Sequence, residues 1–268
     1  NVSAPGLNDI AIHDLGDMWL GDVNAGEGDA YLSARFSIND FDADDTTDVT
    51  ANHITLDAGT GIGNIDRLEL NTGWISAATR GGNVQMLNRA VATPTEIVRL
   101  QTGIGTVDFE QQGAQDLLVL QDSTLSTRGD VLLTNDASIV LEDNAIRARE
   151  GEAALTATSR GSIIKAAAGQ TQTAAPDIYA SHISLIADSN IEADISTTGS
   201  TVYAFSTTGN VDLWNSTEFY TTFDGETQGA GAHLNFIQAG LTPGAEAGDL
   251  EVRLAQTSDG DINITNRL

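Results

Sequence analysis

The densest group of reactive side chains is the acidic run NDFDADDTTD, residues 39–48. Alternate carboxylates on an open loop supply the hard oxygen ligands that Ca²⁺ prefers. Carboxylates this close repel one another unless a cation lies among them. The run is interpreted as a solvated acidic loop, with a Ca²⁺ site as the alternative. The candidate ligands are Asp40, Asp42, Asp44, Asp45 and Asp48.

The run matches neither of two well-known calcium motifs. An EF-hand loop that starts at Asp40 needs glycine at its sixth position and glutamate at its twelfth. The chain has Asp45 and Ala51 at those positions. The nonapeptide pattern GGxGxDxUx of calcium-binding β-rolls does not occur in the sequence either. Ca²⁺ is the only cofactor that we expect.

The four histidines offer little for metal binding or catalysis. His53 and His182 hold matching positions in two similar segments, and each precedes an apolar residue expected to face inward. Both are therefore expected to face solvent, far apart along the molecule. His13 and His233 have no partner at a useful spacing, and the sequence contains no GxSxG motif for a nucleophilic serine.

The many carboxylates leave glycoside cleavage open as an enzymatic alternative, because a glycosidase needs only two carboxylates for its chemistry. Enzymes of this kind that cleave acidic polysaccharides usually add Arg, Lys or Ca²⁺, whereas this chain is poor in cations. Aromatic side chains would stack on sugars, but we interpret those of this chain first as caps or plugs of the core. The carboxylates are Asp194, Asp212, Asp224 and Glu226, and the aromatic residues are Trp19, Trp74, Trp214, Phe219 and Tyr220.

Composition narrows the functional classes. The 268 residues carry 38 Asp and Glu against 12 Lys and Arg, a net charge of −26. A field of that sign repels nucleic acid and anionic membrane surfaces. The absence of cysteine excludes disulfides and thiolate sites, and no apolar run is long enough to predict a membrane span. The chain begins without a signal core, so we expect a processed product or an excised piece.

A short pattern recurs along the chain: glycine, a small polar residue, then apolar-x-apolar. GNVQMLN at 82–88 and GNVDLWN at 209–215 are nearly identical. Glycine with Asp or Asn turns the chain, because these residues tolerate left-handed backbone angles, and the apolar residues then start a half-buried strand. The eight copies start at Gly16, Gly28, Gly82, Gly129, Gly151, Gly209, Gly248 and Gly260.

Period-two alternation of apolar residues fills much of the chain, so an all-β fold is predicted. Only the segment 142–157 is ambiguous between helix and strand. Short strands in one long array, with glycine-polar turns between them, indicate a parallel β-solenoid of about 20–25 residues per coil. Two β-sandwiches in tandem are the alternative.

A longer period suggests two loosely repeated units within one elongated domain, residues 1–268. ANHITLDAGTGIG at 51–63 returns as ASHISLIADSNIE at 180–192. The units span about 16–128 and 129–268. Residues 96–128 and 217–247 fit neither unit cleanly, so we interpret them as loop insertions that project from the rod.

ITLDAGTGIGNIDRLELNT, followed by ISAATRGGNVQMLN, resembles the repeats of filamentous-haemagglutinin-like adhesins and related giant bacterial surface proteins. The resemblance covers about 16–90 well and 129–216 more loosely. It implies a right-handed parallel β-helix, secretion, and a role in adhesion or as a surface fibre. It supplies no catalytic residue.

Two functional hypotheses follow. The first is a non-catalytic structural or adhesive segment at the cell surface, which assembles end to end through open strand edges and meets a host surface or a glycan. The second is a carbohydrate-active β-helix enzyme or a glycan-binding module. Neither involves nucleic acid or insertion into a membrane.

Overall fold

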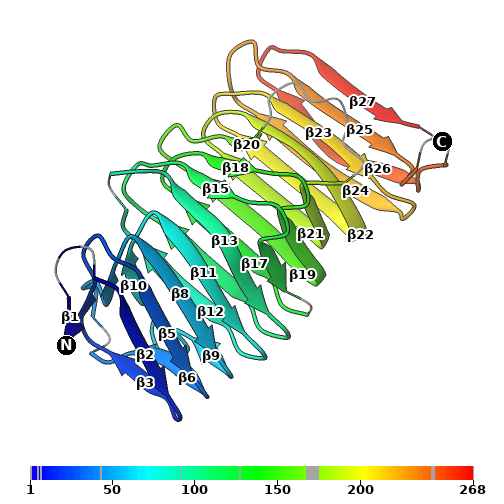
Figure 1. Ribbon diagram of the computed structural model, residues 1–268. Helices are drawn as coiled ribbons and strands as arrows, with labels where there is room; N and C mark the ends of the chain where they lie inside the picture. Colours follow the sequence, from blue (N-terminus) through cyan, green and yellow to red (C-terminus); the bar gives the residue numbers. More distant parts are fainter. Residues whose placement is uncertain are drawn as a thin grey trace.

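The chain folds into an elongated parallel β-solenoid of about 10 turns, with the two termini at opposite ends (Figure 1). The structure is a computed structural model that describes residues 2–4, 6, 8–42, 44–90, 92–126, 128–166, 175–242 and 245–267. Strands and turns make up these ranges, and no helix occurs in them that could cross a membrane. The predicted solenoid is confirmed, and tandem sandwiches are excluded because the strand pairs are parallel.

Two stacks of paired strands run the length of the solenoid. The first stack is β2 (Ile10–Asp14), β5 (Ala30–Ala34), β8 (His53–Ala58), β11 (Trp74–Thr79), β13 (Thr95–Thr102), β15 (Leu117–Val119), β18 (Ile139–Leu141), β20 (Ile163–Lys165), β22 (Ile191–Ser206), β23 (Val211–Ser216), β25 (Leu234–Ala239) and β27 (Ile262–Asn266). The second stack is β3 (Met18–Leu20), β6 (Ser37–Asp40), β9 (Gly61–Ile62), β12 (Val84–Asn88), β14 (Val107–Gln111), β17 (Val131–Asn135), β19 (Ile146–Ala157), β21 (Ile178–Ala187), the later part of β22, β24 (Thr221–Thr227) and β26 (Leu250–Thr257).

Two shorter stacks close the coils. Near the N-terminus, β1 (Val2–Ser3), β4 (Val23–Asn24), β7 (Val49–Thr50) and β10 (Leu68–Asn71) pair in order. In the middle, the second half of β13 pairs with β16 (Thr124–Ser126), which continues into β19, β21 and β22.

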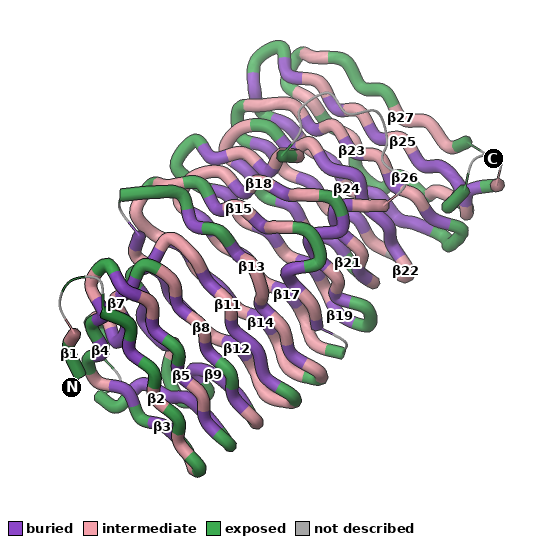
Figure 2. The backbone as a smooth tube through the Cα atoms, in the orientation of Figure 1, coloured by how far each residue is buried: buried purple, intermediate pink, exposed green. Residues whose placement is uncertain are grey.

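Period-two alternation places one face of every coil in a continuous core (Figure 2). Val84, Val107 and Val131 are successive strand partners and are fully buried. They lie 23 and 24 residues apart (107 − 84 and 131 − 107), which confirms the predicted coil length. In the last coils Phe223 and Phe236 stack inside the core, with ring centroids 4.0 Å apart. Burial of each such side chain contributes about 1.5–3 kcal/mol.

A ladder of glycines lines one corner of the solenoid and explains the recurring sequence pattern. A Cβ atom on Gly105 would overlap the carbonyl of Gly82, one on Gly129 would overlap that of Gly105, and one on Gly151 would overlap that of Gly129. None of the eight predicted turn glycines has a positive φ. The predicted reason for glycine, left-handed backbone, is therefore wrong. At each of the eight except Gly16, a Cβ would overlap backbone atoms of a neighbouring coil, so the reason there is the close approach of successive coils.

Buried amides form a second ladder inside the solenoid. Asn88, Gln111 and Asn135 are successive strand partners with no solvent exposure. Asn88 Nδ2 donates hydrogen bonds to the carbonyl of Thr72, 2.9 Å, and to Gln111 Oε1, 2.7 Å, while its Oδ1 accepts the Thr72 N–H at 3.1 Å. These bonds satisfy polar groups where the coil turns inside the core.

Three local predictions are settled by the strand assignments. The ambiguous segment 142–157 contains the strand β19 and no helix. Residues 96–128 hold strands β13 to β16, and residues 217–247 hold β24 and β25, all of them paired within the stacks. These two segments are therefore not projecting insertions. In residues 96–128, β13 divides its pairing between two successor strands, β15 and β16.

Candidate functional site: a buried carboxylate cluster

Three of the five predicted Ca²⁺ ligands come together at one corner of the solenoid. Asp40 ends β6, Asp42 follows it on the loop, and Asp48 directly precedes β7. One carboxylate oxygen from each lies within 4.8 Å of the other two. Asp44 and Asp45 are exposed and outside this group, and Asp44 Oδ1 instead accepts the Thr46 N–H at 2.6 Å.

Two of the three carboxylates are buried, Asp42 is exposed, and the group is only partly hydrogen-bonded. Asp40 and Asp48 are 3% and 1% exposed. Asp40 Oδ1 accepts the Asp42 N–H at 3.1 Å, which leaves its buried Oδ2 without a partner. Asp48 Oδ2 accepts the backbone N–H of Glu69 at 2.9 Å. A buried ionised carboxylate without a partner is costly, so the unused Asp40 oxygen needs an explanation.

Glu69, which the sequence analysis missed, lies beside this group without being one of its three members. It lies on β10 next to Asp48, it is 3% exposed, and its buried Oε2 has no hydrogen-bond partner. The separation of 21 residues between Asp48 and Glu69 is about one coil. Coil spacing applied to the acidic run, rather than the run alone, would have found Glu69.

The electrostatics of the cluster favour the binding of protons or cations to its carboxylates. Burial raises the pKa of Asp48 to about 9, although the Glu69 N–H lowers this pKa and the Asp40 carboxylate raises it further. Burial likewise raises the pKa of Glu69 to about 7, against a lowering by its contact with Asp48. Close contact with Asp40 raises the pKa of Asp42. The surroundings therefore do not stabilise all of these acidic groups in their ionised form.

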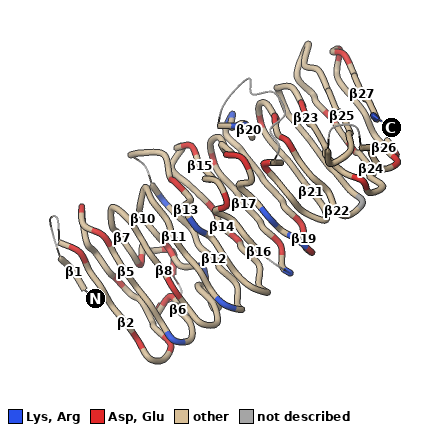
Figure 3. The backbone as a smooth tube through the Cα atoms, turned by 45° about the vertical axis from the view of Figure 1, so that its right-hand side comes forward, with Lys and Arg blue, Asp and Glu red and all other residues tan. Residues whose placement is uncertain are grey.

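Basic side chains do not neutralise the site. Among the described residues, no Lys or Arg forms an ion pair with Asp40, Asp42, Asp48 or Glu69. Arg89, whose charge acts on Glu69, donates its Nη1 hydrogen bond to the Asp45 backbone carbonyl at 2.8 Å. Acidic residues occur along the whole rod and basic residues are sparse (Figure 3).

The histidines are spread over different strands, as expected. His53 on β8 pairs with Asp29 at 2.7 Å and packs edge-on against Trp74. His233 pairs with Asp212 at 3.0 Å. His182 is exposed on β21, in the second stack, whereas β8 belongs to the first.

The four carboxylates considered for glycoside cleavage lie on two different stacks. Asp194 on β22 and Asp212 on β23 belong to the first stack, whereas Asp224 and Glu226 are on β24 in the second. Asp194 is buried and bound to Lys165 Nζ at 2.7 Å. The predicted set is thus divided between two faces and does not form one group.

Asp177, beside the Lys165–Asp194 pair, yields a pH prediction. It is 1% exposed, and its Oδ2 accepts the Asp194 N–H at 2.8 Å. Burial raises its pKa from 3.8 to about 7; the Asp194 N–H and Lys165 oppose the rise, while the charges of Asp194 and Asp143 add to it. The folded state thus binds an extra proton, so this group lowers stability as pH rises from about 4 to 7.

We expect Asp177→Asn to be more stable than wild type by on the order of 2–4 kcal/mol at pH 8 and equally stable near pH 4, because the amide oxygen still accepts the Asp194 N–H. Urea unfolding midpoints at both pH values measure the difference. The exposed Asp143→Asn is the matched control and should show little change. Equal pH slopes for wild type and Asp177→Asn would refute the prediction.

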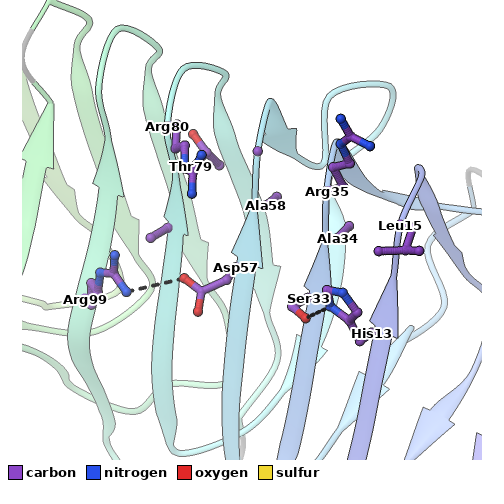
Figure 4. Close-up of a pocket in the computed structure, with 12 residues that line it drawn as sticks. His13, Leu15, Ser33, Ala34, Arg35, Asp57, Ala58, Thr79, Arg80 and Arg99 are labelled. Carbon is purple, nitrogen blue, oxygen red and sulfur yellow. Dashed lines mark hydrogen bonds and ion pairs between the residues drawn. The ribbon is translucent and has the colours of Figure 1, made fainter.

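A second feature is a hollow of about 570 Å³ at the corner beside the first stack (Figure 4). Arg35, Arg80 and Arg99 line it together with His13 and Asp57. Arg99 contacts Asp57 at 3.4 Å, and His13 Nδ1 lies 2.7 Å from Ser33 Oγ. This hollow was not predicted, because the three arginines are far apart in sequence and only the folded coils bring them together.

Comparison of the chain with known protein families, with curated proteins and with solved structures gave no match.

Proposed function

We propose that this chain is a non-catalytic structural and adhesive segment of an extracellular, cell-surface protein, similar in role to the haemagglutinin-like adhesins that its repeats resemble. The observation that carries the proposal is the open C-terminal end of the rod. Among the described residues, β26 pairs only with β24 and β27 only with β25. Unpaired strand edges are templates for a further strand.

The side chains at this end continue the core without a cover. Val252 lies over Phe223 and Ile262 over Leu234, two residues with no solvent exposure. Val252 and Ile262 are themselves 41% and 47% exposed. The exposure of these two residues in line with the core supports the proposal that another coil stacks on this end.

A second copy of this chain is the occupant that we propose for the open end. At the other end of the rod, β2 and β3 are also paired on one side only, with β5 and β6. These strands belong to the same two stacks as β27 and β26, so the stacks would continue from copy to copy. Both end coils carry acidic residues, among them Asp9 and Asp17 at one end and Asp249 and Asp261 at the other. Salt should therefore promote the contact.

Sedimentation velocity tests the proposal. A concentration series at low and high salt should show larger species that increase with both variables. A single species at all concentrations and salt levels would contradict assembly.

A glycan-binding module is the second candidate, and the arginine-lined hollow is the observation that favours it. Arginine binds carboxylate and sulfate groups through paired N–H donors. Positive charge gathered on an otherwise acidic rod suits a short acidic oligosaccharide, whereas the rest of the surface repels a long polyanion.

Calorimetric titration with an oligogalacturonate tests this candidate. We expect Arg80→Ala to weaken binding about 10-fold, because a hydrogen bond to a charged group contributes about 1.5–3 kcal/mol. Arg128→Ala, which removes the same charge from an exposed site beside Glu150, should leave the affinity unchanged. Absence of binding by wild type, or equal loss in both variants, would refute the glycan site.

A further inference from the structure

We propose that Asp40, Asp42 and Asp48 bind one Ca²⁺ ion at the corner of the solenoid, with Glu69 beside them. Their three carboxylate oxygens already lie within 4.8 Å of one another, close enough to surround a single ion. The proposal goes beyond the assembly role, because it concerns a site on the side of the rod rather than its ends.

The buried oxygen without a partner is the observation that distinguishes this site from a solvated acidic loop. Asp40 is 97% buried, and because its Oδ1 is taken by the Asp42 N–H, Oδ2 is the oxygen left for a ligand. Glu69 Oε2 is a second buried oxygen without a partner on the adjoining strand. Solvated acidic loops leave their carboxylates in water, whereas these oxygens are removed from it.

The ligand chemistry selects Ca²⁺ over other metals. The cluster consists of carboxylates, without histidine, and the chain has no cysteine. Oxygen-only sites suit hard cations, whereas zinc and copper prefer nitrogen or sulfur. Ca²⁺ accepts six to eight oxygens in flexible geometry, so water at the exposed Asp42 completes the shell. Mg²⁺ demands a stricter octahedron and gives up its water reluctantly.

Ca²⁺ here would tie successive coils together. Asp40 belongs to β6, Asp48 leads into β7, and Glu69 lies on β10, which pairs with β7. A cation among Asp40, Asp42 and Asp48 would link the end of β6 to the start of β7, and Asp48 in turn accepts the Glu69 N–H of the next coil. The folded state would bind the ion and the unfolded chain would not, so Ca²⁺ should stabilise the fold.

The test is calorimetric titration of the chelator-treated full chain with CaCl₂ at low protein concentration, together with thermal unfolding. We expect one saturable site and a Tm that rises by roughly 5–10 °C at 100 times Kd. The double variant Asp40→Asn/Asp48→Asn should lose the site and the Ca²⁺-dependent Tm rise. Its Tm without calcium should equal or exceed that of wild type, because two crowded buried acid groups are replaced by neutral amides.

Matched controls separate this site from weak binding to the acidic surface. Asp44→Asn/Asp45→Asn removes the same charge from the same run but outside the cluster, and should keep the site and the Tm rise. MgCl₂ should shift the Tm less than CaCl₂. If wild type shows no saturable site, or if both double variants respond to Ca²⁺ as wild type does, the proposal is wrong. Assembly at the rod ends is measured separately, so neither result decides the other.

Discussion

Gly82→Ala is expected to destabilise the protein by about 3 kcal/mol, whereas Gly81→Ala changes stability by less than about 0.5 kcal/mol. A Cβ on Gly82 would overlap the carbonyl of Thr60 in the neighbouring coil. A Cβ on Gly81 would meet only side-chain carbons of Ile104, at 3.7 Å. Neither glycine has a positive φ, so backbone conformation does not separate the two.

Chemical unfolding of the two single variants measures this difference. The neighbouring carbonyl belongs to backbone that is hydrogen-bonded between coils, so it cannot move aside as a flexible side chain would. Because the two substitutions are identical and adjacent in sequence, their effects on the unfolded chain nearly cancel. Equal stability of the variants would show that the coils do not approach as closely as the glycine ladder requires.

Ile262→Asp is expected to abolish end-to-end assembly while the single rod stays folded. Ile262 is half exposed on β27 but lies in register with the buried Leu234. In an assembled rod it would be covered by the next copy, and burial of an unpaired carboxylate costs several kcal/mol. In the separate rod its side chain reaches water, so folding should be little affected.

Asn263→Asp is the control for this variant. Asn263 is exposed on the same strand, its side chain alternates to the outer surface, and it bonds Asn235 at 2.9 Å. The Asn263→Asp substitution adds the same charge at the same end of the rod, but on the outer surface rather than in line with the core. Sedimentation of the two variants should show only Ile262→Asp as a permanently single species. Loss of assembly in both would mean that charge alone, not core continuation, governs the contact.

The fold was predictable because it rests on local periodicity. Alternation such as Ile54 and Leu56 defines inward and outward faces, and the glycine-polar turns define coil length. Which stack a strand joins was not predictable, since β13 divides its pairing between β15 and β16 without a sequence signal. The segment 96–128 was misinterpreted for this reason.

The candidate cation site was half predictable. Asp40, Asp42 and Asp48 were found because they are close in sequence, but Asp44 and Asp45 share that property and lie outside the cluster. Position in the fold, not density of charge, decides between them, because Asp42 is exposed as Asp44 and Asp45 are and still belongs to the cluster. Glu69 and the arginine hollow depend on contacts between coils, which appear only when residues about one coil apart are compared.

Electron microscopy of the purified chain at high concentration, in salt and calcium, tests the central proposal most directly. About 10 turns at ~4.8 Å per stacked strand give a single rod of roughly 48 Å. We predict filaments of constant width that are many times longer than this. Separate rods of single length under all conditions would contradict assembly through the open strand edges.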